Sequence, residues 1–204
     1  MKYSILLVLA ASFFFACNQT EQGNGYHPDA EALQIEALKV YHRKPDSAIS
    51  LLDKATQMDP SFYMSYNTKA MVLSTKEEYP KAIAELYKSL SWKADQPEVY
   101  LQLGMLNDQI NMAEKAGDNY EKAIALYDTR LAESGEYEVQ DRANRAIAIV
   151  MNGEFEKGNK ILEGLMEKHP DDTFLKKLSR ILENKPDSVN ADKEFYLERL
   201  IRNE

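Results

Sequence analysis

From residue 29 to the C-terminus, apolar residues recur at steps of three and four, and almost no stretch alternates apolar and polar residues as a strand would. Such steps place apolar side chains on one face of an α-helix. Clear examples are the stripes in residues 48–55, 82–90, 123–131 and 161–166. The pattern therefore predicts a succession of amphipathic helices and an all-α fold.

A period of about 34 residues runs through this helical region. Around three turns the chain has an aromatic residue, a small residue three positions on and a large residue four positions later, at Tyr79, Tyr120 and Phe155. Ala48 and Ala82 are 34 residues apart, and Ala123 and Gly158 are 35 apart. A period of this length indicates a repeat architecture, in which each helix pair packs on its neighbours.

The period and the small positions resemble the tetratricopeptide repeat, a helix-turn-helix unit of 34 residues. The resemblance implies that a small residue of helix A packs against a small residue of helix B in every unit. The matching helix A residues are Ala37, Ala70, Gly104 and Ala146. The matching helix B residues are Ala48, Ala82, Ala123 and Gly158. The third pair is 19 residues apart, where the second is 12 apart, which predicts extra residues near 110–117 in helix A and its turn.

These matches predict a right-handed superhelical solenoid of helix-turn-helix units. The four units are expected at residues 29–60, 61–95, 97–135 and 137–170. Residues 171–204 contain two further amphipathic stretches with a polar outer side, and we expect them to form a C-terminal capping hairpin. An unrelated helical bundle is the alternative architecture.

The first seventeen residues have the features of an export signal. Lys2 precedes an uncharged run from Ile5 to Ala16, which is too short to span a bilayer. The run ends at Cys17, the single cysteine of the chain. The arrangement resembles a bacterial lipoprotein signal, with Phe residues at 14 and 15 as departures, and implies removal of residues 1–16 and lipid on Cys17. A plain secretory signal with an unrelated cysteine is the alternative.

Residues 17–28 follow as the lipidated cysteine and a polar segment with two glycines, which predicts a flexible tether. The lipoprotein resemblance also implies a location. Asn18 stands where aspartate is the commonest signal for retention in the inner membrane, so the outer membrane, facing the periplasm, is the expected address in the bacterial cell envelope. Exposure on the cell surface is the alternative.

Charge and the absence of catalytic patterns exclude several functions. The chain has 25 Lys and Arg against 33 Asp and Glu, a net charge of −8, which argues against a nucleic-acid-binding surface. His27, His42 and His169 lie far apart in the sequence, so no metal or cofactor is expected. No Ser-His-Asp or Cys-His arrangement can be argued. We expect no enzyme activity; an envelope glycan hydrolase with a lone catalytic Glu is the alternative.

Two short motifs have two interpretations. The segments around Ser47 and Ser188, DSA and DSV, fit an O-glycosylation pattern found in some envelope proteins of Gram-negative bacteria. Asp and Ser at the start of a helix also bond to free backbone groups there. The sequence leaves both interpretations open.

A protein-binding surface is the remaining expectation. In tetratricopeptide-repeat proteins the A helices line the concave side of the solenoid, and their exposed positions contact ligands. The corresponding residues here are Gln34, Leu38, Tyr41, Asn67, Met71, Thr75, Leu101, Met105, Asp108, Ala143, Ile147 and Val150. This largely neutral set favours a peptide or protein with apolar anchors. The predicted function is a non-catalytic scaffold or assembly factor in the envelope, with pilotin-like escort of a secretion or pilus subunit as a further alternative.

Overall fold

The computed structural model describes residues 25–133 and 138–182. The predicted signal, Cys17, Ser188 and the last predicted helix lie outside these residues. Within them the chain forms α-helices and no strand. The helices are α2 (Pro28–Val40), α3 (Pro45–Met58), α4 (Tyr63–Thr75), α5 (Tyr79–Trp92), α6 (Pro97–Gln109), α7 (Ala113–Ala132), α8 (Glu138–Met151), α9 (Phe155–Lys168) and α10 (Thr173–Leu182).

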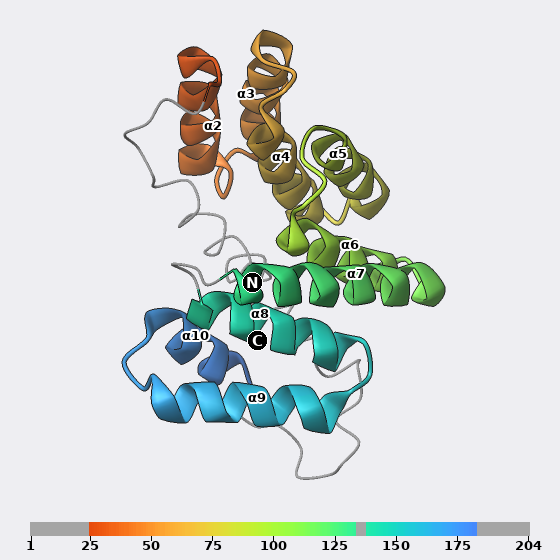
Figure 1. Ribbon diagram of the computed structural model, residues 1–204. Helices are drawn as coiled ribbons and strands as arrows, with labels where there is room; N and C mark the ends of the chain where they lie inside the picture. The colour runs from red at the N-terminus through yellow and green to blue at the C-terminus, as the bar shows by residue number, and fades with distance from the viewer. Residues whose placement is uncertain (1–24, 134–137, 183–204) are drawn as a thin grey trace.

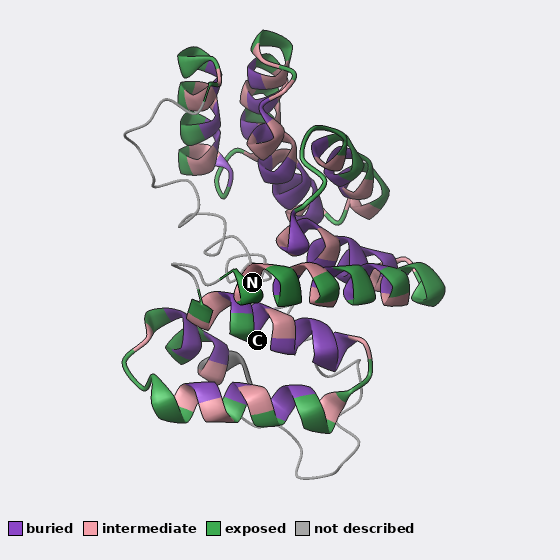
Figure 2. Cartoon of the chain, in the orientation of Figure 1, coloured by how far each residue is buried: buried purple, intermediate pink, exposed green. Residues whose placement is uncertain are grey.

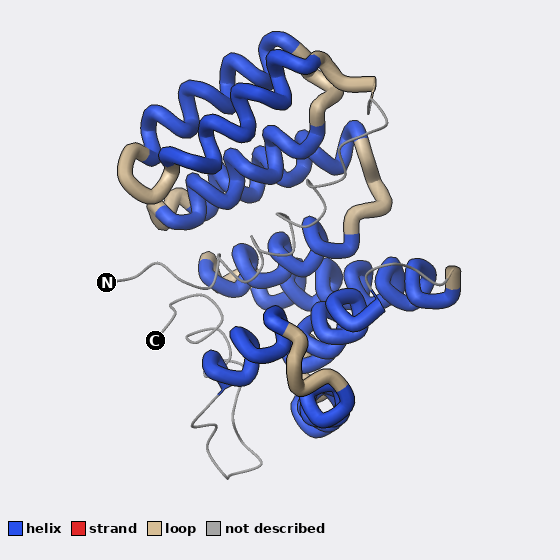
Figure 3. Tube along the Cα trace, turned by 90° about the vertical axis from the view of Figure 1, so that its left-hand side faces the viewer, coloured by secondary structure: helices blue, strands red, loops and turns tan. Residues whose placement is uncertain are grey.

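Consecutive helices pack as hairpins, and each hairpin packs on the next (Figure 1). The hairpins are α2–α3, α4–α5, α6–α7 and α8–α9, and we call their first members A helices and their second members B helices. Helix α2 also contacts α4, and α6 contacts α8, while α10 packs on α9. The view in Figure 3 shows the short loops between them. The predicted all-α fold of stacked helix pairs is therefore confirmed.

Three of the A helices end in the same turn. The residue two positions after the helix has a positive φ, which is 60° at Glu77, 59° at Asn111 and 95° at Gly153. In each turn the next backbone N–H donates to the carbonyl oxygen five residues earlier, for example Met112 to Asn107 at 2.8 Å. This is the Schellman arrangement, which satisfies the last carbonyl groups of a helix. The turn therefore sets where each B helix begins.

The turns show that the third unit was predicted in the wrong register. The small residue of each B helix lies five positions after the positive-φ residue, at Ala82, Ala116 and Gly158. Ala116, which is fully buried, thus takes the place predicted for Ala123. Helix α6 is not lengthened; the extra residues extend α7, which has 20 residues where α5 has 14. Ala116 and Ala123 are about two helical turns apart and share a face, so the sequence pattern fits both.

The interior of each pair is filled by a large side chain four residues after the small one. These side chains are Leu52, Leu86, Tyr120 and Leu162, all at most 2% exposed. Helices α6 and α8 are buried along most of their length, whereas α7 and α9 have exposed outer faces (Figure 2). Of the three junctions between hairpins, that of α5 with α6 packs least extensively.

Two glycines allow the helices of a pair to approach closely. A Cβ atom on Gly104 would overlap the ring of Tyr120. A Cβ atom on Gly158 would overlap the side chain of Val150 and the carbonyl oxygen of Ala146. Glycine inside a helix costs about 0.5–1 kcal/mol relative to alanine, so at these two positions the close approach outweighs helix propensity.

We expect Gly104→Ala to lower the free energy of unfolding by about 1–3 kcal/mol, because the added methyl group overpacks the interior. Gly164 of α9 is the matched control, since nothing lies within 4 Å of its Cβ position. There alanine should raise the free energy of unfolding by about 0.5–1 kcal/mol through helix propensity. Urea unfolding measures both, and a change of the same sign in the two variants would contradict the close-contact explanation.

Candidate protein-binding surface

The twelve predicted partner residues lie on the four A helices, three to a helix, with Tyr41 directly after the end of α2. In α4, Asn67, Met71 and Thr75 follow at steps of four, so they share one side of the helix. We call the twelve residues the A-helix face. The contacts of α2 with α4 and of α6 with α8 bring neighbouring parts of this face together.

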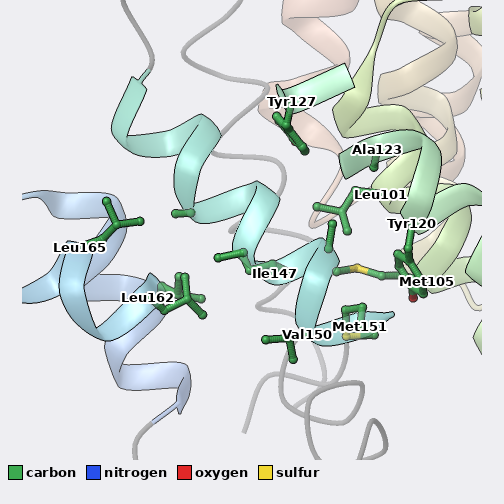
Figure 4. Close-up of a cluster of buried hydrophobic side chains, with 14 of the residues drawn as sticks. Leu101, Met105, Tyr120, Ala123, Tyr127, Ile147, Val150, Met151, Leu162 and Leu165 are labelled. Carbon is green, nitrogen blue, oxygen red and sulfur yellow. The ribbon is translucent and has the colours of Figure 1, made fainter. Parts of the chain in front are cut away.

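Most of the A-helix face is buried. The nine buried residues are Gln34, Tyr41, Asn67, Met71, Leu101, Met105, Ala143, Ile147 and Val150. Leu38, Thr75 and Asp108 are half-buried. Leu101 and Met105 of α6 belong to the same apolar cluster as residues of α7 to α10 (Figure 4). A charged residue at either position would therefore disturb folding, and the role of the twelve residues as partner contacts stays a prediction.

A chain of hydrogen bonds fixes the orientation of Asn67. The Nε2 group of Gln96 donates to the carbonyl oxygen of Lys93 at 2.7 Å and to Oγ of Ser89 at 3.0 Å. The Oε1 atom of Gln96 accepts from Nδ2 of Asn67 at 2.9 Å. Because a carbonyl oxygen can only accept, both amide orientations follow. The remaining atom, Oδ1 of Asn67, is buried and has no hydrogen-bond partner.

The next A helix, α6, contains a donor that is also buried without a hydrogen-bond partner, the Nε2 group of Gln102. A buried polar group left in this way costs about 1–3 kcal/mol, and native proteins contain few of them. Sequence reasoning found Asn67 but missed Gln96 and Gln102. For Gln102 the available signal was a glutamine within an otherwise apolar stretch, whereas the polar segment around Gln96 offers none. Oδ1 of Asn67 is an acceptor and Nε2 of Gln102 is a donor, and a peptide unit has one N–H donor and one carbonyl acceptor.

An ion-pair cluster joins the third hairpin to the fourth. Arg130, in the added turns of α7, contacts Oε1 and Oε2 of Glu98 on α6 at 2.6 and 3.1 Å, and Oδ1 of Asp141 on α8 at 3.2 Å. Its guanidinium carbon lies 5.6 Å from the centre of the Tyr127 ring, a cation–π distance. One cation thus holds carboxylates from two A helices.

The cluster changes the proton affinity of its members. Burial raises the pKa of Asp141 to about 6; the charge of Arg130 opposes this rise and the charge of Glu98 adds to it. Burial lowers the pKa of Arg130, but the hydrogen bonds and charge of Glu98 and the charge of Asp141 outweigh burial and raise it. Arg130 therefore stays charged, and Asp141, whose pKa is about 6, is the member that takes up a proton in mildly acidic solution.

The buried carboxylates of the described residues are Glu85 and Asp141, and each is paired with basic side chains. No three His, Cys, Asp or Glu residues in these ranges are grouped to hold a metal ion. No helix described is long and apolar enough to cross a membrane.

Comparisons with known proteins identify one unit directly. The family model described as tetratricopeptide repeat matches residues 97–129, which are α6 and most of α7. The match confirms the predicted resemblance. No curated protein matches the sequence.

Several solved structures share the arrangement of helices. MamA is 18% identical, with 84% of this chain and 89% of MamA covered and a TM-score of 0.50. YrrB, described as a TPR protein with an unusual peptide-binding site, is 17% identical over 74% of this chain and 92% of its own, with a TM-score of 0.45. PilW, described as a widely conserved type IV pilus biogenesis factor, is 17% identical over 85% and 81%, with a TM-score of 0.49. At these identities the likeness to MamA concerns the fold alone.

We expect Asp141→Asn to reduce the dependence of stability on pH. A carboxyl group whose pKa is higher in the folded than in the unfolded chain contributes most to stability when protonated, and loses this contribution as pH rises through the folded pKa. For Asp141 the window runs from 3.8 to about 6. Relative to the natural chain, the asparagine variant should therefore gain about 2–3 kcal/mol in free energy of unfolding between pH 4 and pH 7.5. Denaturant unfolding at both pH values measures this gain; a constant or shrinking difference would refute it.

Proposed function

We propose that this chain, which carries a tetratricopeptide repeat within a solenoid of helix pairs, is a non-catalytic protein-binding scaffold of the bacterial cell envelope. Its partner binds along the A-helix face, and lipid on Cys17 anchors it. The observation that carries the proposal is the tetratricopeptide repeat at residues 97–129, because stacked repeats of this kind form extended binding surfaces.

The A-helix face favours an uncharged, apolar segment of a partner. Asp108 is its one charged residue, and Met71 and Met105 bring flexible side chains that adapt to different shapes. A peptide unit offers one N–H and one carbonyl oxygen, which complement Asn67 and Gln102 respectively. The hydrogen bond to Gln96 fixes the orientation of the Asn67 amide. Its Oδ1 atom is buried in the free chain, so this atom has to become accessible before a partner can bind it.

A site for catalysis has less support than a site for binding. The lone-Glu alternative requires a carboxyl group free to exchange protons with a substrate. Glu85 is the buried glutamate among the described residues, and its Oε1 atom contacts Lys69 at 3.2 Å and Lys88 at 2.9 Å. These ion pairs join α4 to α5 and lie away from the A-helix face.

We expect a photo-crosslinking residue at Thr75 to capture the partner in intact cells, because Thr75 is a half-buried member of the A-helix face. The same residue at the exposed Lys157 of α9 is the positional control and should not capture it. Equal capture from both positions, or capture from Lys157 alone, would contradict binding at the A-helix face.

With the captured partner purified, Gln102→Met should weaken its affinity about tenfold, the effect of one lost buried hydrogen bond. The same change should leave the stability of the free chain equal or higher, because it removes an unpaired buried donor of similar shape. Gln57→Met on the exposed side of α3 is the matched control. Unchanged affinity in the Gln102 variant would count against the proposed hydrogen bond.

We expect Cys17→Ala to abolish incorporation of labelled fatty acid and to release the chain from the membrane fraction, since acyl chains on that cysteine are the proposed anchor. Labelling with an alkyne fatty acid and cell fractionation measure the two effects. A Ser50→Ala variant serves as the unrelated control. Label retained by the Cys17→Ala variant would rule out that cysteine as the lipid site.

A further inference from the structure

A pocket opens between the first two hairpins. Its volume is about 500 Å³. Residues of α3, α4 and α5 line it. We call it the B-helix slot. From α3 the lining residues are Asp46, Ile49 and Ser50. From α4 they are Lys69 and Leu73, together with Lys76 directly after the helix. From α5 they are Lys81, Ala84 and Glu85, together with Glu78 directly before the helix.

The B-helix slot and the A-helix face lie on opposite sides of α4. Lys69 and Leu73 stand two residues after Asn67 and Met71, and a helix turns by about 100° per residue. The two pairs therefore point about 200° apart around the helix axis. A ligand in the slot would leave the A-helix face free, so the slot is a separate surface.

Ion pairs lie at both ends of the slot. At one end Lys76 contacts Asp46 at 2.5 Å and Glu78 at 2.9 Å. At the other end Lys69 contacts Glu85 at 3.2 Å and also pairs with Asp53. Ile49, Leu73 and Ala84 lie among these groups as the apolar part of the lining. The slot thus has apolar side chains at its centre and charged side chains at both ends.

One charged group in the slot is incompletely paired. Glu85 is 7% exposed, and its Oε1 atom accepts from both Lys69 and Lys88. Its Oε2 atom is buried and has no hydrogen-bond partner. A buried carboxylate oxygen in this condition favours a ligand that brings a positively charged donor.

We propose that the B-helix slot is a second interaction site, which takes an arginine side chain from a partner protein. The methylene groups of arginine would lie on Ile49, Leu73 and Ala84, as basic side chains do on apolar surfaces. The planar guanidinium group would pair with the Glu85 carboxylate through two parallel hydrogen bonds, a geometry that lysine cannot reproduce. Because Oε2 is buried in the free chain, the Glu85 side chain would turn toward the slot as the arginine enters. Lys88 is the group it displaces, since that side chain is 57% exposed and returns to water.

The charge of the chain favours this occupant over an acidic one. The net charge of the whole sequence is −8, which attracts a basic segment from a distance. The lining itself is balanced, with Lys69, Lys76 and Lys81 against Asp46, Glu78 and Glu85. The net charge of the chain is therefore what favours a basic partner.

The test is a titration of the full chain with the peptide acetyl-Leu-Arg-Leu-amide, followed by NMR of the Ile49 and Ala84 methyl groups and by calorimetry. The control peptide carries citrulline in place of arginine, which keeps the shape and removes the charge. We expect saturable shifts at Ile49 and Ala84, and affinity at least tenfold lower for the citrulline peptide. Equal affinity for the two peptides, or shifts confined to Leu38 and Thr75 of the A-helix face, would overturn the proposal.

Two variants locate the binding. Ala84→Leu fills the slot from an exposed position and leaves every ion pair in place, so it should abolish arginine-peptide binding; Ala125→Leu, at an exposed position of α7, should not. Glu85→Gln should lower the affinity at least tenfold, provided that circular dichroism shows an intact fold. Undiminished binding by the Ala84→Leu chain would refute the slot as the site. Crosslinking through Thr75 should persist in that variant, because the two surfaces are independent.

Discussion

The close approach of two helices at a small residue is the constraint on which the rest of the structure depends. Where Gly104 faces the ring of Tyr120, there is no room for even one methyl group. Once the two helices are held at this distance, the large side chain four residues after the small residue of the B helix packs into the interior between them. The Schellman turns then determine the rotation of each B helix relative to its A helix. The positions of the A-helix face and of the B-helix slot are consequences of this local geometry.

The long α7 is the main departure from regular repetition. Its added turns carry Tyr127 and Arg130, and Arg130 links Glu98 of one A helix to Asp141 of the next. Ion pairs also join the first two hairpins, between α3 and α4. The cluster around Arg130 differs from them because it contains a carboxyl group of raised pKa. Buried ion pairs add little to stability in general but restrict the ways in which two surfaces can meet. The extension thus gives the third and fourth hairpins a defined relative orientation.

The sequence was sufficient to predict the helices, their pairing and the repeat, because apolar steps and small residues report directly on burial. It was insufficient for the register of the third unit, since Ala116 and Ala123 lie on the same side of α7 and only the turn at Asn111 distinguishes them. The positions of the A-helix face followed from spacing, but their burial did not, because spacing says nothing about what surrounds a helix. Gln96 and Gln102 carried no periodic signal. The B-helix slot is formed by three consecutive helical segments within residues 46–85, and no motif marks it.

The limited packing of α5 on α6 has a mechanical consequence. Hairpins that contact only their neighbours are connected in series, so a tension applied along the stack is carried by every junction in turn. The junction with the smallest packed area should yield first, at the place where the hydrogen bond from Asn67 to Gln96 crosses from α4 to the start of α6. A chain anchored at one end and attached to a partner at the other would then lengthen at one defined point. Under such tension the domain would extend at the junction between the second and third hairpins, while the other junctions stay packed.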